Sequence, residues 1–170
     1  LLEIDAEEQS LDHDGDVATV EMGQLVRCKS GAGEFVDRSG RVVSIFSGTA
    51  FIASGGSTIT LLNGVTRFAI PSGLGRFEVV TDEVTTTVVG TIFEVQRWAS
   101  KRRSEVRVIE GSVAVARGDR IPLPLRAGER VEVTSRGLMF HAVRIEKEGE
   151  GPLPGARLGG TARGEFREPE

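Results

Sequence analysis

Short runs of alternating apolar and polar residues fill most of the chain between residues 17 and 143. The alternation is clearest within Arg76–Ala116, in the runs Thr91–Gln96, Glu105–Ile109 and Ser112–Val115. A period of two is typical of strands with one buried face and one solvated face. The pattern therefore predicts four short strands in Arg76–Ala116, separated by turns.

Further strands are predicted on both sides of this block. They are Val17–Glu21, Gln24–Lys29, Glu34–Asp37, Arg41–Phe46, Thr49–Ala53, Ser57–Leu62, Val65–Ile70, Arg130–Thr134 and Leu138–Val143. Their connections are short and rich in Gly, Ser and Asn, and Asn63-Gly64 is the strongest hairpin signal among them. No apolar spacing of 3.6 residues persists over a dozen positions in 17–143. The sequence predicts an all-β domain.

A weak internal repeat indicates how these strands stack. In each copy a glycine is followed by two or three residues and then by two apolar residues with one residue between them. The glycines are Gly48, Gly64, Gly90, Gly111 and Gly128. A rung-like repeat of this kind favours a β-solenoid, in which each rung buries its apolar face against the next. Because the spacing is irregular, a double-sheet β-sandwich remains the alternative.

Composition divides the chain into three parts. Residues 1–16 are an acidic lead-in, residues 17–143 the β domain, and residues 144–170 a tail dense in Gly, Pro and charge. Such a tail is expected to be a linker or a segment ordered by a partner. Its isolated apolar residues, Leu153, Leu158 and Phe166, are candidate anchors on a partner surface. Pro122 and Pro124 restrict their segment to an extended stretch or an edge strand.

Charge and cysteine content exclude some classes of protein. The net charge of −4 over 170 residues argues against a nucleic-acid partner. Cys28 is the only cysteine, so no intrachain disulfide forms, and we expect a buried thiol. No apolar run reaches the roughly 18 residues that span a bilayer, and no signal peptide is present. Because the chain begins at Leu1 rather than Met, we expect a processed form or an excised piece, with any membrane anchor outside it.

Catalytic and metal-binding patterns are missing from the sequence. Asp12, Asp14 and Asp16 have the spacing of calcium ligands, but the required later Gly and Glu are replaced by Val17 and Gly23. A metal cluster would have to bring Cys28 together with the two histidines, His13 and His141. Neither a nucleophile motif nor a phosphate-binding loop occurs. We therefore expect a protein that is not an enzyme and has no cofactor.

The best candidate for a binding site is the segment from Trp98 to Arg103. A tryptophan stands there beside three basic residues, Lys101, Arg102 and Arg103, at a predicted hairpin tip. Such a tip could dock a carboxylate of a partner or an anionic polymer. The alternative is a solvated loop with Trp98 folded back on the sheet edge.

The pattern from about residue 33 to residue 133 resembles the FecR domain, the extracytoplasmic module of FecR-type transmembrane signalling regulators. The resemblance rests on a Gly-Thr-x-Phe-x-Val strand, a Val-x-Glu-Gly-x-Val hairpin and neighbouring motifs in the family's order. The residues that carry it are Gly64, Phe77, Gly90, Thr91, Phe93, Val95, Gly111, Val113 and Gly128.

The resemblance implies a periplasmic, non-enzymatic protein-interaction domain that relays envelope signals to an anti-sigma/sigma factor system. Its partners would be envelope proteins, such as an outer-membrane transducer, bound by strand addition at a sheet edge. The cytoplasmic segment, transmembrane helix and second periplasmic domain of the family are not found in this chain. Two alternatives stay open: a structural β-domain subunit of a cell-envelope assembly, and a carbohydrate-binding β-solenoid, for which aromatic residues are scarce.

Overall fold

The computed structural model describes residues 1–4, 7–9, 17–134, 137–139 and 161–167. Most of the described residues lie in strands. The one helical element in these ranges is the three-residue 3-10 turn η1 (Ala99–Lys101). The predicted all-β class is confirmed.

The described residues form seventeen strands. They are β1 (Leu2–Ile4), β2 (Glu7–Gln9), β3 (Val17–Glu21), β4 (Leu25–Cys28), β5 (Ala32–Asp37), β6 (Val42–Phe46), β7 (Ala50–Gly55), β8 (Thr58–Ile70), β9 (Phe77–Val80), β10 (Thr85–Val88), β11 (Thr91–Trp98), β12 (Arg103–Glu110), β13 (Ser112–Ala116), β14 (Leu123–Arg126), β15 (Arg130–Thr134), β16 (Gly137–Met139) and β17 (Thr161–Arg167).

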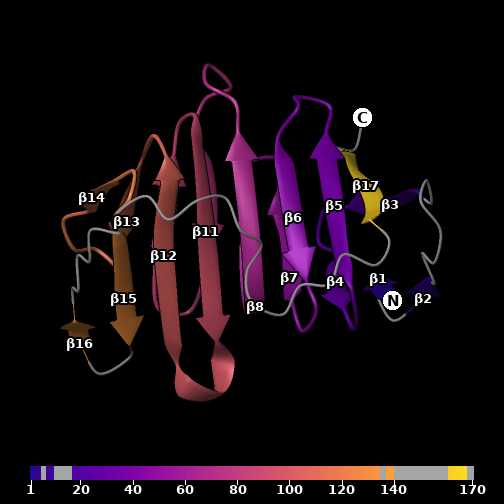
Figure 1. Ribbon diagram of the computed structural model, residues 1–170, viewed down its shortest axis with the longest axis horizontal. Helices are drawn as coiled ribbons and strands as arrows, with labels where there is room; N and C mark the ends of the chain where they lie inside the picture. The colour runs from indigo at the N-terminus through magenta and orange to yellow at the C-terminus, as the bar shows by residue number, and fades with distance from the viewer. Residues whose placement is uncertain (5–6, 10–16, 135–136, 140–160, 168–170) are drawn as a thin grey trace.

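Hydrogen bonding arranges the strands in two ladders that share β8. The first ladder has the order β2-β1-β4-β7-β8-β9-β10-β13-β14. The second has the order β3-β17-β5-β6-β8-β11-β12-β15-β16. Neighbours are antiparallel in both ladders except for the parallel pairs β8–β9, β17–β3 and β17–β5. Figure 1 shows β12, β11, β8, β6 and β5 side by side, with the yellow β17 beyond β5.

The hairpin predicted at Asn63-Gly64 is wrong, because β8 continues through it as one strand. Residues before this point pair with β7 and β9, and those after it with β6 and β11. Gly64 has φ +96°, and a Cβ there would lie 2.5 Å from the Cα of Thr49. The glycine thus lets β8 pass from one ladder to the other against a closely packed neighbour, instead of turning back.

Two further predictions for Arg76–Ala116 are corrected. The block holds five strands rather than four. Its strand β10 begins with three threonines, so it lacks the contrast between apolar and polar residues on which the prediction relied. The strands on either side of Gly111 also do not pair: β12 joins β11 and β15, whereas β13 joins β10 and β14. Gly111, with φ +82°, is a corner between the ladders and not a hairpin turn.

One core of apolar side chains draws on both ladders. Phe68 of β8 stacks on Phe93 of β11, with ring centroids 5.0 Å apart, and lies 5.8 Å from the ring of Phe77. Phe35 of β5 and Phe51 of β7 form a second pair, edge to face at 5.7 Å. The Phe68–Phe77 and Phe35–Phe51 contacts connect strands of different ladders, so the core holds the two ladders together.

Burial largely follows the alternation of the sequence along β11, with Glu94 as the buried exception. Along β11, Thr91, Phe93 and Val95 point into the core. At the sheet edge, β14 pairs only with β13 among the described strands, and Pro124 lies within it. The edge position agrees with the proline prediction, because proline cannot donate to a further ladder. Cys28 is a buried free thiol, as expected.

Candidate functional site

The β11–β12 hairpin brings the predicted binding residues to one end of the second ladder. Its two strands pair along their length, up to Trp98 opposite Arg103. The turn η1 closes the connection between them. We refer to residues Trp98–Arg103 as the hairpin end.

Two of the four predicted residues face solvent and two stack on each other. Lys101 and Arg102 are exposed. The guanidinium of Arg103 lies 4.1 Å from the centroid of the half-buried Trp98 ring, within cation–π range. Arg103 also forms an ion pair of 3.2 Å with Glu132 of β15. The hairpin end therefore presents two exposed cations beside the stacked pair of Trp98 and Arg103.

Arg102 adopts the left-handed conformation, with φ 47° and ψ 53°. It is the one non-glycine residue with positive φ in the described ranges. Its backbone N–H donates to the carbonyl of Ala99 at 3.1 Å, which closes the turn. This conformation costs about 1–2 kcal/mol for a residue with a Cβ, and glycine would avoid most of that cost. With arginine at this position the domain is less stable than it would be with glycine, but the tip carries a positive charge.

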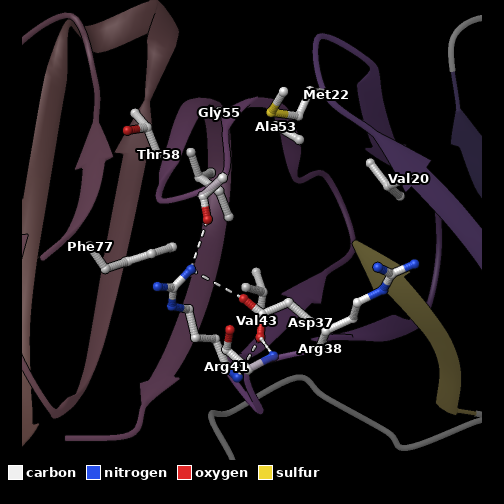
Figure 2. Close-up of a pocket in the computed structure, with 13 residues that line it drawn as sticks. Val20, Met22, Asp37, Arg38, Arg41, Val43, Ala53, Gly55, Thr58 and Phe77 are labelled. Carbon is white, nitrogen blue, oxygen red and sulfur yellow. Dashed lines mark hydrogen bonds and ion pairs between the residues drawn. The ribbon is translucent and has the colours of Figure 1, made fainter. Parts of the chain in front are cut away.

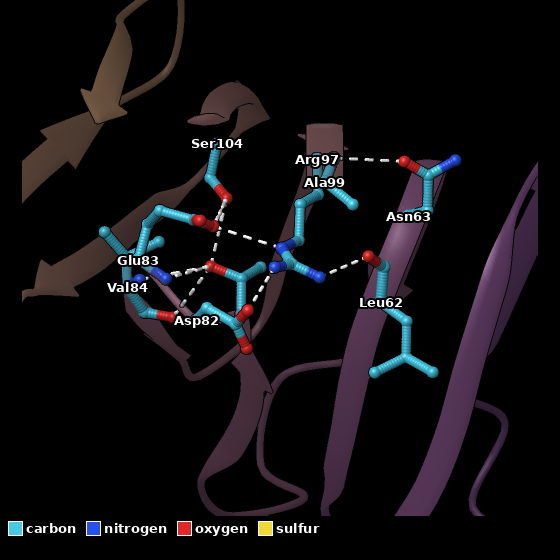
Figure 3. A network of polar contacts seen from close by, with 9 residues as sticks. Leu62, Asn63, Asp82, Glu83, Val84, Arg97, Ala99 and Ser104 are labelled. Carbon is cyan, nitrogen blue, oxygen red and sulfur yellow. Dashed lines mark hydrogen bonds and ion pairs between the residues drawn. The ribbon is translucent and has the colours of Figure 1, made fainter. Parts of the chain in front are cut away.

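Directly beneath the hairpin end lies a buried polar network centred on Arg97 (Figure 3). Arg97 is 6% exposed, and its Nε donates to Glu83 Oε2 at 3.1 Å. It also donates to the carboxylate of Asp82 and to the carbonyl of Leu62. Ser104 completes the network by donating to Glu83 Oε2 at 2.8 Å.

The network ties two separate segments to the hairpin end. Glu83 belongs to the turn between β9 and β10, where Thr81 Oγ1 accepts the N–H groups of Glu83 and Val84 at 3.2 and 3.1 Å. Leu62 belongs to β8, and its neighbour Asn63 accepts the N–H of Ala99 at 3.1 Å. Because a buried charge needs its partners in place, these contacts fix the hairpin end relative to both ladders. A rigid platform is what a contact surface for another protein requires.

The predicted residues outside the hairpin are not brought to it by any described contact. Leu153 and Leu158 lie outside the described residues, as do His13, His141, Asp12, Asp14 and Asp16. Phe166 belongs to β17, of which the backbone is described. Within the described part of the chain, no three His, Cys, Asp or Glu side chains converge to hold a metal ion.

The polar network was not among the features predicted from the sequence. A signal for it was present, because Arg97 continues the inward-facing series Thr91, Phe93 and Val95 at the same parity. A charged residue at an inward position requires a buried partner. The acidic pair Asp82-Glu83 lies in a turn that appears solvated from sequence alone, so its role as that partner became visible only in three dimensions.

A cavity of about 120 Å³ lies at the far side of the fold, beside the β5–β6 turn (Figure 2). Its walls include Val20, Val43 and Phe77, with Arg41 at one side. The Arg41 guanidinium pairs with Asp37 at 3.3 Å and donates to the carbonyls of Gly56 and Leu74 at 2.7 and 3.2 Å. Through these bonds Arg41 holds three loops together.

The family model of the FecR protein matches residues 34–114. The chain contains a FecR domain. The match runs from β5 to β13, so it includes the core phenylalanines Phe68 and Phe93, the polar network and the hairpin end. The resemblance seen in the sequence is confirmed. No helix in the described ranges has the length and apolar character needed to cross a membrane.

Two crystal structures of one protein from Parabacteroides distasonis, at 1.65 and 2.50 Å resolution, are similar to this FecR domain. That protein is described as a "putative anti-sigma factor". Each structure aligns with a TM-score of 0.62 at 19% identity, over 72% of this chain and 60% of theirs. At this identity the likeness shows a shared fold. The chain spans less than two thirds of the length of these relatives. A search of curated proteins found no match.

Proposed function

We propose that the chain is the extracytoplasmic interaction domain of a signalling regulator, which relays contact with envelope proteins to an anti-sigma/sigma factor system. The match of residues 34–114 to the FecR family carries this proposal. The fold shared with a protein described as an anti-sigma factor agrees with it. The domain acts by binding and has no catalytic role.

The hairpin end is the partner-contact surface in this proposal. Lys101 and Arg102 offer two exposed positive charges, which favour a partner with carboxylates at its contact surface. Trp98, stacked under Arg103, supplies the aromatic anchor that is typical of the centre of an interface. The buried network of Arg97 holds both in position before a partner arrives, which lowers the entropic cost of association.

The extracytoplasmic location is tested by cysteine labelling in cells of the native host. Ser100→Cys places a reactive thiol in the exposed hairpin end, and a membrane-impermeant maleimide is added to cells with a permeabilised outer membrane. We expect labelling of the variant before cell lysis. The unmodified chain is the matched control, because its one thiol, Cys28, is buried. Labelling that occurs only after lysis would overturn the assigned location.

The contact surface is tested by a photo-crosslinking amino acid placed at Lys101 in the same cells. The control position is Arg120, which is exposed and basic but lies in the turn between β13 and β14. We expect a crosslinked envelope protein from position 101 and none from position 120. No adduct at 101, or the same adducts at both positions, would contradict the proposed surface.

A further inference from the structure

The C-terminal strand β17 lies between β3 and β5, and each of these strands also has contacts that do not involve β17. On one side it pairs with β3, from Arg163 opposite Val17 to Arg167 opposite Glu21. On the other side it pairs with β5, from Thr161 opposite Ala32 to Phe166 opposite Asp37. Both pairings are parallel, and no other described strand pairs with β3. We refer to the gap between β3 and β5 as the acceptor slot.

Contacts that do not involve β17 hold β5 along its length and β3 at its C-terminal end. Strand β5 pairs with β6 along its other edge, and Phe35 packs edge to face on Phe51. Strand β3 is followed by a tight turn, in which Gln24 Oε1 accepts the N–H of Glu21 at 2.7 Å. The same turn is tied to β7, because the N–H of Gly23 donates to the carbonyl of Ala53 at 2.7 Å.

The two walls are separated by the width of one strand, which β17 occupies. Neighbouring strands lie about 4.8 Å apart, so β3 and β5 are roughly 10 Å apart across β17. Each wall turns a row of backbone N–H and C=O groups toward the gap, and only a strand can satisfy both rows at once. A slot of this kind accepts an extended peptide through main-chain hydrogen bonds.

The strand that fills the slot has an unusual sequence for a central position. Thr161–Arg167 reads TARGEFR, with one large apolar residue, two arginines and a glycine. Central strands are normally rich in β-branched and aromatic residues. The described interactions of β17 are its main-chain pairings, and a strand with a more favourable sequence can compete for the same groups.

The connection to β17 is long enough to let it leave and return. Residues 140–160, which are 21 in number, separate β16 from β17 in sequence. Seven strand spacings lie between these two strands in the second ladder, a distance of roughly 34 Å. Twenty-one extended residues reach up to about 70 Å. A connection of this length allows β17 to compete for the slot at an effective concentration on the order of millimolar.

We propose that the acceptor slot is a binding site for an extended peptide strand of a partner protein, and that β17 is its tethered internal occupant. The incoming strand runs parallel to β5 and replaces β17. The cavity lined by Val20, Asp37 and Arg38 opens at the end of β3 and β5, where the incoming strand leaves the slot (Figure 2). Arg38 is exposed and has no hydrogen bond or ion pair in the described part of the chain, so a strand with an acidic residue at that end is favoured.

The inference goes beyond the proposed function and is tested separately from it, on the purified full chain. The variant Gly164→Pro/Glu165→Pro removes two adjacent backbone donors of β17, one toward each wall. The matched control is Gly164→Ala/Glu165→Ala, which keeps both donors. Amide hydrogen exchange of β3 and β5 is measured in each, with and without a synthetic peptide of residues 158–170.

In the proline variant, we expect the slot-facing amides of β5 to exchange at least tenfold faster than in the control. The peptide should restore their protection. In the unmodified chain, β17 competes with the peptide at an effective concentration on the order of millimolar. At about 0.1 mM, the peptide should therefore occupy the slot in at most about a tenth of the molecules. We expect the peptide to bind the unmodified chain at least tenfold more weakly than the proline variant. Unchanged exchange in the proline variant, or equal peptide binding by both chains, would overturn the inference.

A measurement on the unmodified chain covers the case in which the proline variant does not fold. If β17 leaves its slot without unfolding the domain, its amides exchange through a local opening while the β5–β6 pairs remain protected. We expect exchange at residues 161–167 at least a hundredfold faster than at the amides of β5 that pair with β6. Equal protection of both groups would mean that β17 is an integral strand, and would overturn the inference.

Discussion

Arg97 and Glu83 form an ion pair in which both side chains are almost completely buried, with 3.1 Å between Nε and Oε2. The pair joins the β11–β12 hairpin to the turn between β9 and β10. A pair in this setting contributes less to net stability than to position, because desolvation of two charges offsets much of their attraction. Its importance appears when one partner is removed and the other charge stays buried.

Removal of one charge from this pair should therefore be strongly destabilising. Glu83→Gln leaves the Arg97 guanidinium without its buried counter-charge, and we expect a loss of about 3–5 kcal/mol in the free energy of unfolding. Asp82→Asn is the matched control. Its side chain is 75% exposed although it also contacts Arg97, so we expect a loss below about 1 kcal/mol. Urea denaturation of both variants measures the difference, and equal losses would show that the network does not depend on the buried pair.

The stacked rings of Phe68 and Phe93 predict a second large effect. Phe93 is fully buried between the ladders, so Phe93→Ala creates a cavity and should cost about 3–5 kcal/mol. The neighbouring Ile92 points to the other face of β11 and is partly exposed. We expect Ile92→Ala to cost less than half as much. Thermal or urea unfolding of the two variants separates them, and a cost for Ile92→Ala equal to that for Phe93→Ala would contradict the assigned core.

Two glycines with similar φ distinguish backbone strain from close packing. Gly73 has φ +84° with nothing within 4 Å of a built Cβ, whereas Gly64 has φ +96° with Thr49 in contact. Gly73→Ala should cost about 1–2 kcal/mol, the penalty of the left-handed conformation alone. Gly64→Ala adds a steric overlap, and we expect a further loss of about 1–3 kcal/mol. Equal losses in a denaturation experiment would show that β8 does not need a glycine where it changes ladders.

Burial of Cys28 predicts a dependence of stability on alkaline pH. Desolvation by burial raises the pKa of this thiol above its ordinary value of 9.0, against smaller opposing effects of the N-terminal ammonium and of a hydrogen bond to Ser30. As pH rises, the unfolded chain releases the thiol proton first. At pH values below its ordinary pKa, the buried thiol thus makes its full contribution to the free energy of unfolding. This contribution is lost progressively as the pH rises toward the pKa of the thiol in the folded state.

The measurement compares the unmodified chain with Cys28→Ala in urea at pH 7.5 and pH 10. The variant should be less stable at the lower pH, because it lacks a buried sulfur atom. The difference in the free energy of unfolding between the two proteins should be smaller at the higher pH. A difference that is constant between the two pH values would show that the thiol titrates alike in the folded and unfolded chains.

The local pattern of the sequence predicts strands well and connections poorly. Period-two alternation located β11 and the inward side of Phe93 and Val95, because each depends on neighbours within a few residues. Asn63-Gly64 and Gly111 were interpreted as hairpin turns, yet each carries the chain from one ladder to the other. A glycine with positive φ is compatible with both geometries, and long-range pairing decides between them.

The candidate site was predictable only at its surface. A tryptophan beside three basic residues identified the hairpin end, since exposed charge clusters are visible in sequence. The support beneath it joins Arg97 and Ser104 of one hairpin to Glu83 of the turn between β9 and β10, and no local pattern reports such convergence. The placement of β17 between β3 and β5 is a pairing of the same kind, across more than a hundred residues.

The strained arginine at the tip gives a direct test of the proposed function. Arg102→Gly removes the charge and also relieves the left-handed conformation, so the domain should be slightly more stable while its contact surface is impaired. A loss of function in this variant cannot arise from unfolding. The matched control is Arg120→Gly, which removes an exposed charge from the turn between β13 and β14.

The decisive measurement is the transcript profile of the native host carrying Arg102→Gly in the full-length gene, compared with a gene deletion and with Arg120→Gly. If the hairpin end of a FecR domain relays contact to a sigma factor, the deletion changes a defined set of transcripts. Arg102→Gly then changes the same set, at unaltered protein level, while Arg120→Gly leaves it unchanged. A deletion without effect on transcription, or an Arg102→Gly profile identical to that of the unmodified host, would contradict the account.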